Sequence, residues 1–138
     1  MGNKLLTTLS IILSVIVNLV ACRETIAKEQ RTVEQIMVDT ANEINKTLPR
    51  RLNEHTTIDT VVADNRTFWY KCTLINTRKF KFNYKESEEF QGPMLIKNLC
   101  TSREIRPMMD KGISYVYIYF DKSGSELIRF KIDSSKCL

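Results

Sequence analysis

The hydrophobic pattern changes period three times between residues 31 and 138, and this alternation constrains the fold more than any other feature of the sequence. Apolar residues first recur at helical spacing, and Pro49 stops the pattern because its ring clashes with the geometry of a helix interior. We therefore expect a first helix of about 20 residues that ends near Leu48. Its predicted buried stripe consists of Val33, Ile36, Met37, Ala41, Ile44 and Leu48.

Two runs of β-branched and aromatic residues follow, and the residues between them favour a hairpin. The runs are Thr57–Ala63 and Thr67–Ile75, and Asp64-Asn65 between them is a pair that tolerates positive φ. Because side chains alternate along a strand, one face of the second run collects Phe68, Tyr70, Cys72 and Leu74. The alternation continues through "RKFKFNY", which either prolongs this strand or forms a third.

The second half repeats the order of helix and hairpin. Residues 86–92 are polar and turn-like, and an apolar helix is expected to begin at Pro93, a favoured first helical position. Ser102 can cap a further turn that Gly112 ends. Residues 114–120 and 125–133 then read as two strands joined by "DKSG". The order α-β-β-α-β-β predicts a two-layer α+β domain, with an antiparallel sheet and helices on one face.

An apolar segment precedes this domain and ends abruptly at a cysteine. Lys4 supplies a positive charge, and Leu5–Ala21 is an apolar segment of 17 residues. A membrane-spanning helix normally needs ~20 residues, so the segment is slightly short for a span. Small residues close it, as a secretory signal requires. Its end is the quartet Leu19-Val20-Ala21-Cys22.

This quartet resembles the lipobox of bacterial lipoproteins, in which the cysteine is lipid-modified and the signal is cleaved before it. The resemblance implies a signal peptide at 1–21, lipidation at Cys22, a tether at 22–30 and a single α+β domain at 31–138. The acyl chains would hold the protein on a bilayer. By the same resemblance, Arg23 implies the periplasmic face of the outer membrane, because inner-membrane retention favours Asp there. A simple signal peptide cut near Ala21 and an uncleaved anchor are the alternatives.

Three cysteines remain after Cys22, and an odd count in an exported protein leaves one bridge and one thiol. We expect a disulfide between Cys100 and Cys137, since a bridge there would hold a final strand in place. A loop of roughly 36 residues corresponds to about 3–4 kcal/mol on the chain-entropy model. Cys72 is expected to be buried within its strand, and an intermolecular disulfide is the alternative. The spacings match no zinc pattern.

The chain is mildly basic, with 21 Lys and Arg against 16 Asp and Glu and a net charge of +5. This is well short of a nucleic-acid-binding composition, so no nucleic-acid partner is expected. The most distinctive surface is "TRKFKFNYK", where aromatic residues interleave with Arg78, Lys79, Lys81 and Lys85. The simplest interpretation is an amphipathic strand with its aromatic residues in the core. The alternative is a binding edge that takes an acidic or extended partner by strand addition.

No motif selects a catalytic site. His55 is the single histidine and is expected in an exposed loop. There is no G-x-S-x-G element, and four glycines in the chain leave no phosphate-cradling loop. The carboxylates of Glu86, Glu88 and Glu89 are adjacent in a predicted turn and point apart. We expect no enzymatic activity, no metal and no cofactor.

Longer stretches of the chain look like small exported bacterial proteins of unassigned role. They are "MVDTANEINKTLP", "TIDTVV" and "IKNLCTSREIRPMMDKGISYVYIYFDKSG", followed by the final cysteine. In size and layout the chain is also similar to the α+β pilotin lipoproteins of type II secretion systems, which carry a secretin to the outer membrane. These resemblances imply a membrane-anchored periplasmic lipoprotein that binds or assembles another envelope component, with a secretin chaperone as one form of that role. A small periplasmic enzyme or hydrolase inhibitor is the alternative from another class.

Overall fold

The computed structural model describes residues 31–77 and 81–137. The chain divides into two compact units, and the second, Val33–Leu138, contains every element described below. The predicted signal peptide, the tether and Cys22 lie outside the described residues.

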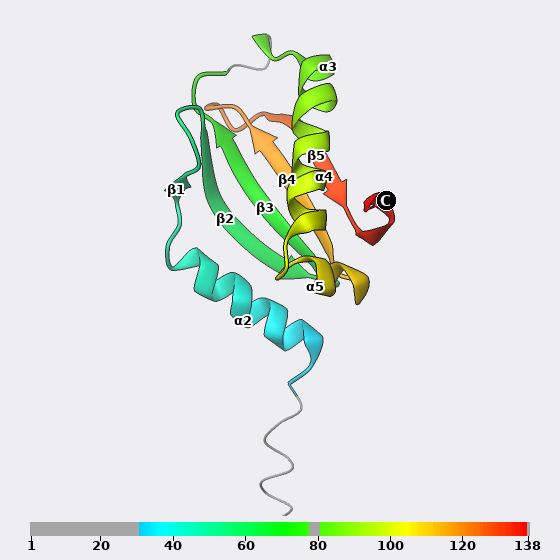
Figure 1. Ribbon diagram of the computed structural model, residues 1–138. Coiled ribbons are helices and arrows are strands. Elements are labelled where there is room, and N and C mark those ends of the chain that lie inside the picture. Colours follow the sequence, from blue (N-terminus) through cyan, green and yellow to red (C-terminus); the bar gives the residue numbers. More distant parts are fainter. Residues whose placement is uncertain (1–30, 78–80, 138) are drawn as a thin grey trace, which may run out of the picture. The chain divides into compact units, whose positions relative to one another are not determined.

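Within the described residues, one sheet has the strand order β1-β2-β3-β4-β5. The class predicted from the sequence is confirmed, because helices pack against this single sheet in an α+β arrangement (Figure 1). The strands are β1 Arg50–Arg51, β2 Thr56–Asp64, β3 Thr67–Leu74, β4 Ser114–Phe120 and β5 Glu126–Ile132.

The two central strands run parallel, and the expectation of an antiparallel sheet throughout was wrong at this point. β3 pairs with β4 in parallel, with Phe68 opposite Tyr115, whereas the other neighbouring strands are antiparallel. Parallel strands need a long crossover connection. The helical residues between β3 and β4 supply that crossover, so the two hairpins meet side by side.

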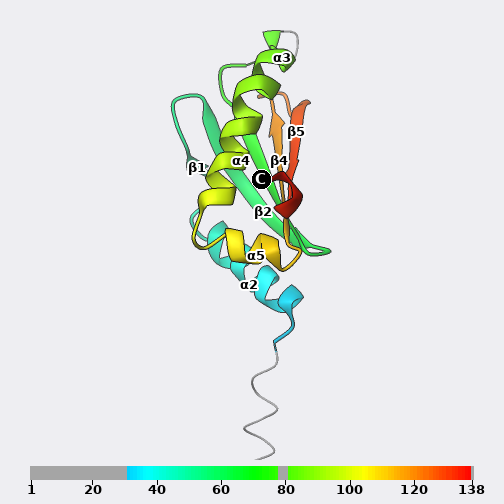
Figure 2. The same cartoon turned by 45° about the vertical axis from the view of Figure 1, so that its right-hand side comes forward.

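The helices and one face of the sheet together form a single hydrophobic core. Met37, Leu99 and Met109, from three different helices, belong to the same buried cluster as Phe68 and Cys72 of β3. Figures 1 and 2 show α2 near one end of the sheet and α4 along its length. The helices are α2 Val33–Asn45, α3 Tyr84–Glu86, the π-helix η2 Ser87–Gln91, α4 Gly92–Thr101, α5 Arg106–Asp110 and the 3-10 turn η3 Ser134–Lys136.

Both predicted hairpins are present. Asn65 and Arg66 have φ values of 46° and 55°, which is the backbone of a type I′ turn between β2 and β3. Gly124 has φ 82° in the turn between β4 and β5, where glycine adopts the left-handed region without a steric penalty.

The first helix ends earlier than the sequence indicated, because its last residue bonds to the sheet. Asn45 Oδ1 accepts a hydrogen bond from Val61 N at 2.8 Å, and Asn45 Nδ2 donates to Val61 O at 2.7 Å. The Thr60 hydroxyl also donates to Asn45 Oδ1 at 3.2 Å. This one side chain fastens α2 to β2. The pairing of Arg50 with Ile58 adds a short β1, which the sequence reasoning missed.

The segment after β3 is not a strand where it is described. Lys81 precedes a helical region, and Lys85 lies within α3. Asn83 begins this helix, since its Oδ1 accepts from Glu86 N at 3.1 Å and its Nδ2 donates to Glu86 Oε2 at 3.2 Å. This reciprocal cap satisfies the helix terminus and overrides the alternating pattern. The polar residues expected to form a turn before Pro93 continue the helix as η2.

Candidate binding site

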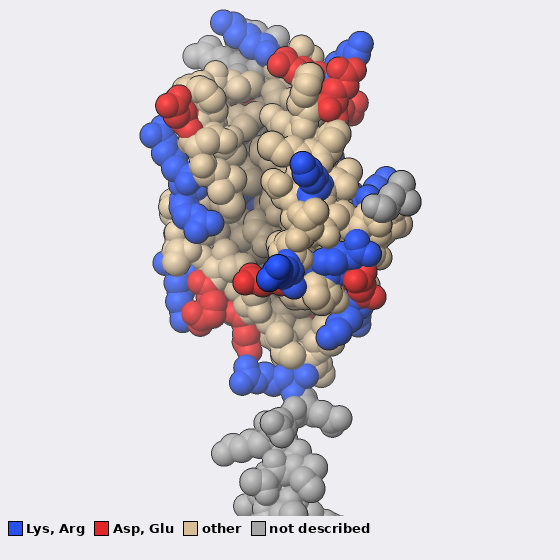
Figure 3. Space-filling model, in the orientation of Figure 1, with Lys and Arg blue, Asp and Glu red and all other residues tan. Residues whose placement is uncertain are grey.

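A cavity lies at the end of β3, and we refer to it as the β3-end cavity. It has a volume of about 440 Å³, and its walls come from the β1–β2 connection, the end of β3, Thr77 and the segment from Lys81 to η2. Its wall includes Asn53, His55, Leu74, Phe82, Phe90 and Gln91. Figure 3 shows a hollow in this face of the molecule, between the β1–β2 side and α4, whose surface is mostly uncharged. A hollow of this size is large enough to take several side chains of a partner.

The helical region between β3 and β4 shapes one wall of the cavity. Phe82 contacts Tyr84 edge-to-face, with ring centroids 4.9 Å apart. The π-helix η2 then follows, and its Phe90 side chain is 69% exposed beside the cavity. Single π-turns are frequent at functional sites because they displace side chains from regular helical positions. Here the π-turn leaves a large aromatic ring in solvent.

Exposed apolar residues also lie in the segments next to the cavity walls, directly before Asn53 and directly after η2. Leu52 is 49% exposed on the β1–β2 connection, and Met94 is 56% exposed on α4. Phe90 and Met94 are four residues apart on adjoining helical turns, so they are neighbours on the helix surface. Leu52, Phe90 and Met94 form what we term the apolar rim. Apolar side chains grouped around a hollow are typical of a surface that binds another chain.

Polar groups in the cavity offer few reactive arrangements. His55 is exposed in the β1–β2 connection, as the sequence predicted, and its Nδ1 lies 3.3 Å from Asn76 Nδ2. Gln91 Oε1 is buried without a hydrogen-bond partner among the described residues. Those residues hold no group of three or more His, Cys, Asp or Glu side chains that could bind a metal ion.

Two of the four basic residues singled out in the sequence, Lys81 and Lys85, lie in the part of the chain that the structure describes. Lys81 is exposed and contributes to the wall of the β3-end cavity. Lys85 points into solvent from α3, with its Nζ 3.9 Å from Glu89 Oε1. Arg78 and Lys79 lie outside the described residues. Lys85 is therefore part of a helix and not of a strand.

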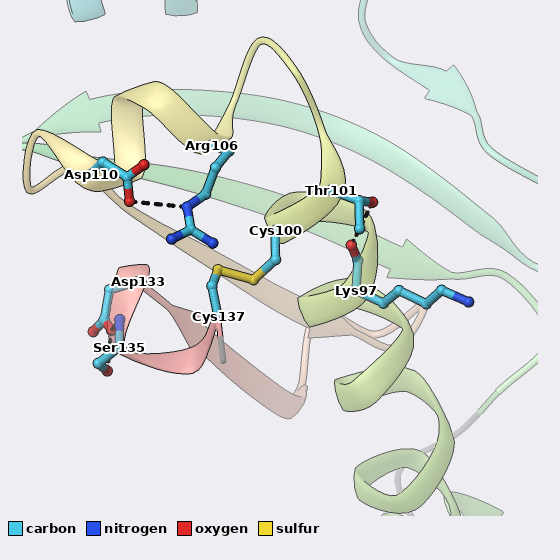
Figure 4. Close-up of a disulfide and its surroundings, with 8 residues drawn as sticks. All are labelled: Lys97, Cys100, Thr101, Arg106, Asp110, Asp133, Ser135 and Cys137. Carbon is cyan, nitrogen blue, oxygen red and sulfur yellow. Dashed lines mark hydrogen bonds and ion pairs between the residues drawn. A yellow bond between two sulfur atoms is a disulfide. The ribbon is translucent and has the colours of Figure 1, made fainter.

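The cysteines occupy two different environments. A disulfide joins Cys100 at the end of α4 to Cys137 after η3, and Figure 4 shows it beside the Arg106–Asp110 ion pair. Cys72 is fully buried in β3. Burial raises the pKa of the Cys72 thiol to about 12, with a smaller contribution from the nearby Asp59 carboxylate. A neutral, buried thiol is a poor nucleophile.

In the part of the chain that the structure describes, no helix is long and apolar enough to cross a membrane. The fold and the β3-end cavity thus define an α+β domain with an open hollow at the end of β3.

The chain belongs to a family described as a domain of unknown function, DUF8479, whose model matches residues 31–128. A search of curated proteins finds no match. Among solved structures, the chain is similar to a protein of Pseudomonas aeruginosa described as secreted, with a TM-score of 0.67 at 12% identity. That alignment covers 79% of this chain and 100% of the other.

Two pilotins of type 2 secretion systems have the same fold. The pilotin EpsS of Vibrio vulnificus aligns with a TM-score of 0.64 at 12% identity, over 76% of this chain and 91% of that protein. The pilotin AspS of Vibrio cholerae aligns with a TM-score of 0.60 at 18% identity, over 81% of this chain and 98% of that protein. The fold is therefore one that secretion pilotins use.

Proposed function

We propose that this protein is a non-enzymatic binding protein of the bacterial cell envelope, and that it acts as a pilotin-like chaperone of a secretin. The observation that carries the proposal is the likeness in fold to two pilotins, which extends over 91% and 98% of their own lengths. Fold alone does not fix function, so the proposal also depends on a surface suited to the task.

The β3-end cavity and the apolar rim are that surface. Phe90 exposes apolar area beside the cavity and Met94 exposes apolar area four residues further along, in α4, and the centre of the hollow carries little charge (Figure 3). An apolar segment of the secretin would bury these side chains on binding. Each fully buried side chain of this size contributes about 1.5–3 kcal/mol, so two of them would dominate a moderate affinity.

The proposed location is the periplasmic face of the outer membrane, with lipidation of Cys22 as the anchor. A chaperone that delivers a secretin to the outer membrane needs durable attachment, which two or three acyl chains supply and a single chain does not. Palmitate labelling of the wild type but not of Cys22→Ser would support the anchor. Equal labelling of both would exclude it.

The direct test is secretin assembly in cells that lack the gene. Deletion should reduce heat-resistant secretin multimers in the outer membrane, and wild-type protein should restore them. A variant with Phe90→Ser and Met94→Ser should be stable and exported but fail to restore assembly.

The matched control is Val62→Ser. Val62 is 54% exposed, close to the 56% of Met94, and its neighbour Val61 is buried in the core. Since consecutive strand residues face opposite ways, Val62 lies on the other face of the sheet. Normal secretin assembly in the deletion strain would refute the proposed function, and equal loss with the Val62 variant would exclude the apolar rim.

A further inference from the structure

The outer edge of β5 has no partner strand. β5 is the last strand in the sheet order, and the described element drawn past it in Figure 1 is the short turn η3, which is not a strand and contacts α4 and α5. Among the described residues its backbone hydrogen-bonds only to β4. An outer strand of seven residues therefore presents a row of open N–H and C=O groups. The other outer strand, β1, has only two residues and offers no comparable edge.

A groove of about 350 Å³ runs between β5 and α4. Gly92, Pro93 and Ile96 line it on the helix side, and Phe130 lines it on the strand side. The helix packs very closely here, because a Cβ at Gly92 would lie 3.2 Å from Phe130 Cε1. A helix beside an open edge strand is an arrangement into which an extended peptide can insert as an additional strand.

The side chains of β5 define the chemistry that such a peptide needs. Ile128, Phe130 and Ile132 pair with Tyr119, Tyr117 and Tyr115 on the face that carries the core. Arg129 and Lys131 alternate with them and point to the opposite face. Arg129 pairs with Glu126 at 2.9 Å, whereas Lys131 makes no ion pair within the described part of the chain.

We propose that β5 binds, by strand addition, an extended partner segment whose apolar and acidic residues alternate. Apolar residues of the segment would enter the groove beside Ile96 and Phe130. Its acidic residues would lie across from Arg129 and Lys131, where opposite-charge pairs stabilise neighbouring strands. A second copy of β5 would instead place like charges opposite each other, which disfavours self-pairing.

This surface lies on the opposite edge of the sheet from β1, and the proposal stands whether or not the partner at the β3-end cavity is a secretin. The probe is a fluorescein-labelled peptide of alternating Val and Glu, equal in length to β5, with both ends blocked. Fluorescence anisotropy would measure its dissociation constant with the folded protein. A peptide with Lys in place of Glu controls for the sign of the charge.

Backbone N-methylation separates strand addition from simple charge attraction. In an added strand, alternate N–H groups point toward β5 and the others point to solvent. Two peptides are needed, one methylated at every Val and one at every Glu. Only one of them should lose binding, by about tenfold or more, because a single lost hydrogen bond of ordinary strength already approaches that factor.

The protein variants are Lys131→Glu and a matched Lys46→Glu. Lys46 follows α2, which packs on β2 at the far side of the sheet, so it receives the same charge change away from β5. Lys131→Glu should weaken the acidic peptide several-fold and Lys46→Glu should not. Amides on the outer edge of β5 should also gain protection from hydrogen exchange when the peptide binds.

Two results would overturn the proposal. One is no binding of the acidic peptide at millimolar concentration, which would mean that Arg129 and Lys131 only guard the edge against aggregation. The other is equal weakening by the two methylated peptides or by the two lysine variants, which would reduce the interaction to unspecific charge attraction.

Discussion

Replacement of Asn45 by Ala should detach the end of α2 from the sheet. The change removes the hydrogen bonds of Asn45 with Val61 N, Val61 O and the Thr60 hydroxyl, at 2.8, 2.7 and 3.2 Å. Each ordinary bond contributes about 1 kcal/mol net, and a partly buried backbone group left without a partner adds to the loss. We expect the free energy of unfolding to fall by about 2–4 kcal/mol.

Urea unfolding followed by circular dichroism would measure this loss, and Asn42→Ala is the control. Asn42 is exposed on the same helix, so its replacement should be neutral or slightly stabilising because Ala has the higher helix propensity. Asn45→Asp keeps the oxygen acceptor but loses the donor to Val61 O, and it should give an intermediate loss. A difference below about 0.5 kcal/mol between Asn45→Ala and Asn42→Ala would refute the reasoning.

Three further predictions concern the cysteines and a turn. Replacement of Cys100 and Cys137 together by Ser should lower the free energy of unfolding by about 4 kcal/mol for a separation of 37 residues, and reduced wild type should match the variant in urea unfolding. The pKa of Cys72 is raised in the folded protein, so between pH 9 and pH 12 the unfolded chain loses the thiol proton and the folded chain keeps it. The free energy of unfolding should therefore be unaffected by this group below pH 9 and should fall by about 1.4 kcal/mol per pH unit up to pH 12. The stability difference between wild type and Cys72→Ala should shrink over that pH range; a constant difference would contradict the shift. Asp121→Ala should cost about 2–3 kcal/mol, since this buried carboxylate accepts from the backbone of Ser123 and Ser125 at 2.9 and 3.0 Å, and thermal melts would test it.

The sequence predicted the elements whose signals are local. The β2–β3 hairpin follows from a β-branched run, a turn pair and an aromatic run, and the structure places positive φ at Asn65 and Arg66. Ser102 was predicted to cap a turn, and its Oγ accepts a hydrogen bond from Ile105 N at 3.2 Å. Gly112 was predicted to end that helical region, and its φ is 84°. Propensity and turn chemistry suffice for such features because few residues determine them.

The features that the sequence did not predict depend on contacts between distant residues. Nothing local to Phe68 or Tyr115 specifies that β3 and β4 run parallel. The alternation through Lys81 and Lys85 indicated a strand, but the cap formed by Asn83 and Glu86 produced a helix. The β3-end cavity joins the β1–β2 connection to η2, and no motif marks either segment. Phe90 and Met94 are four residues apart, and the sequence shows them to be neighbours on one surface only once this segment is known to be helical.

The parallel contact between β3 and β4 also has a kinetic consequence. Each hairpin can close early because its strands are adjacent in the chain, but the two hairpins meet only after the long helical crossover is organised. The rate-limiting step of folding should therefore be the docking of the hairpins along Phe68 and Tyr115. In chevron measurements, truncation at this junction should slow folding, whereas truncation at Val62 should mainly speed unfolding. Until the hairpins dock, both halves expose unpaired strand edges, so a chain exported before folding would pass through its most aggregation-prone state after translocation.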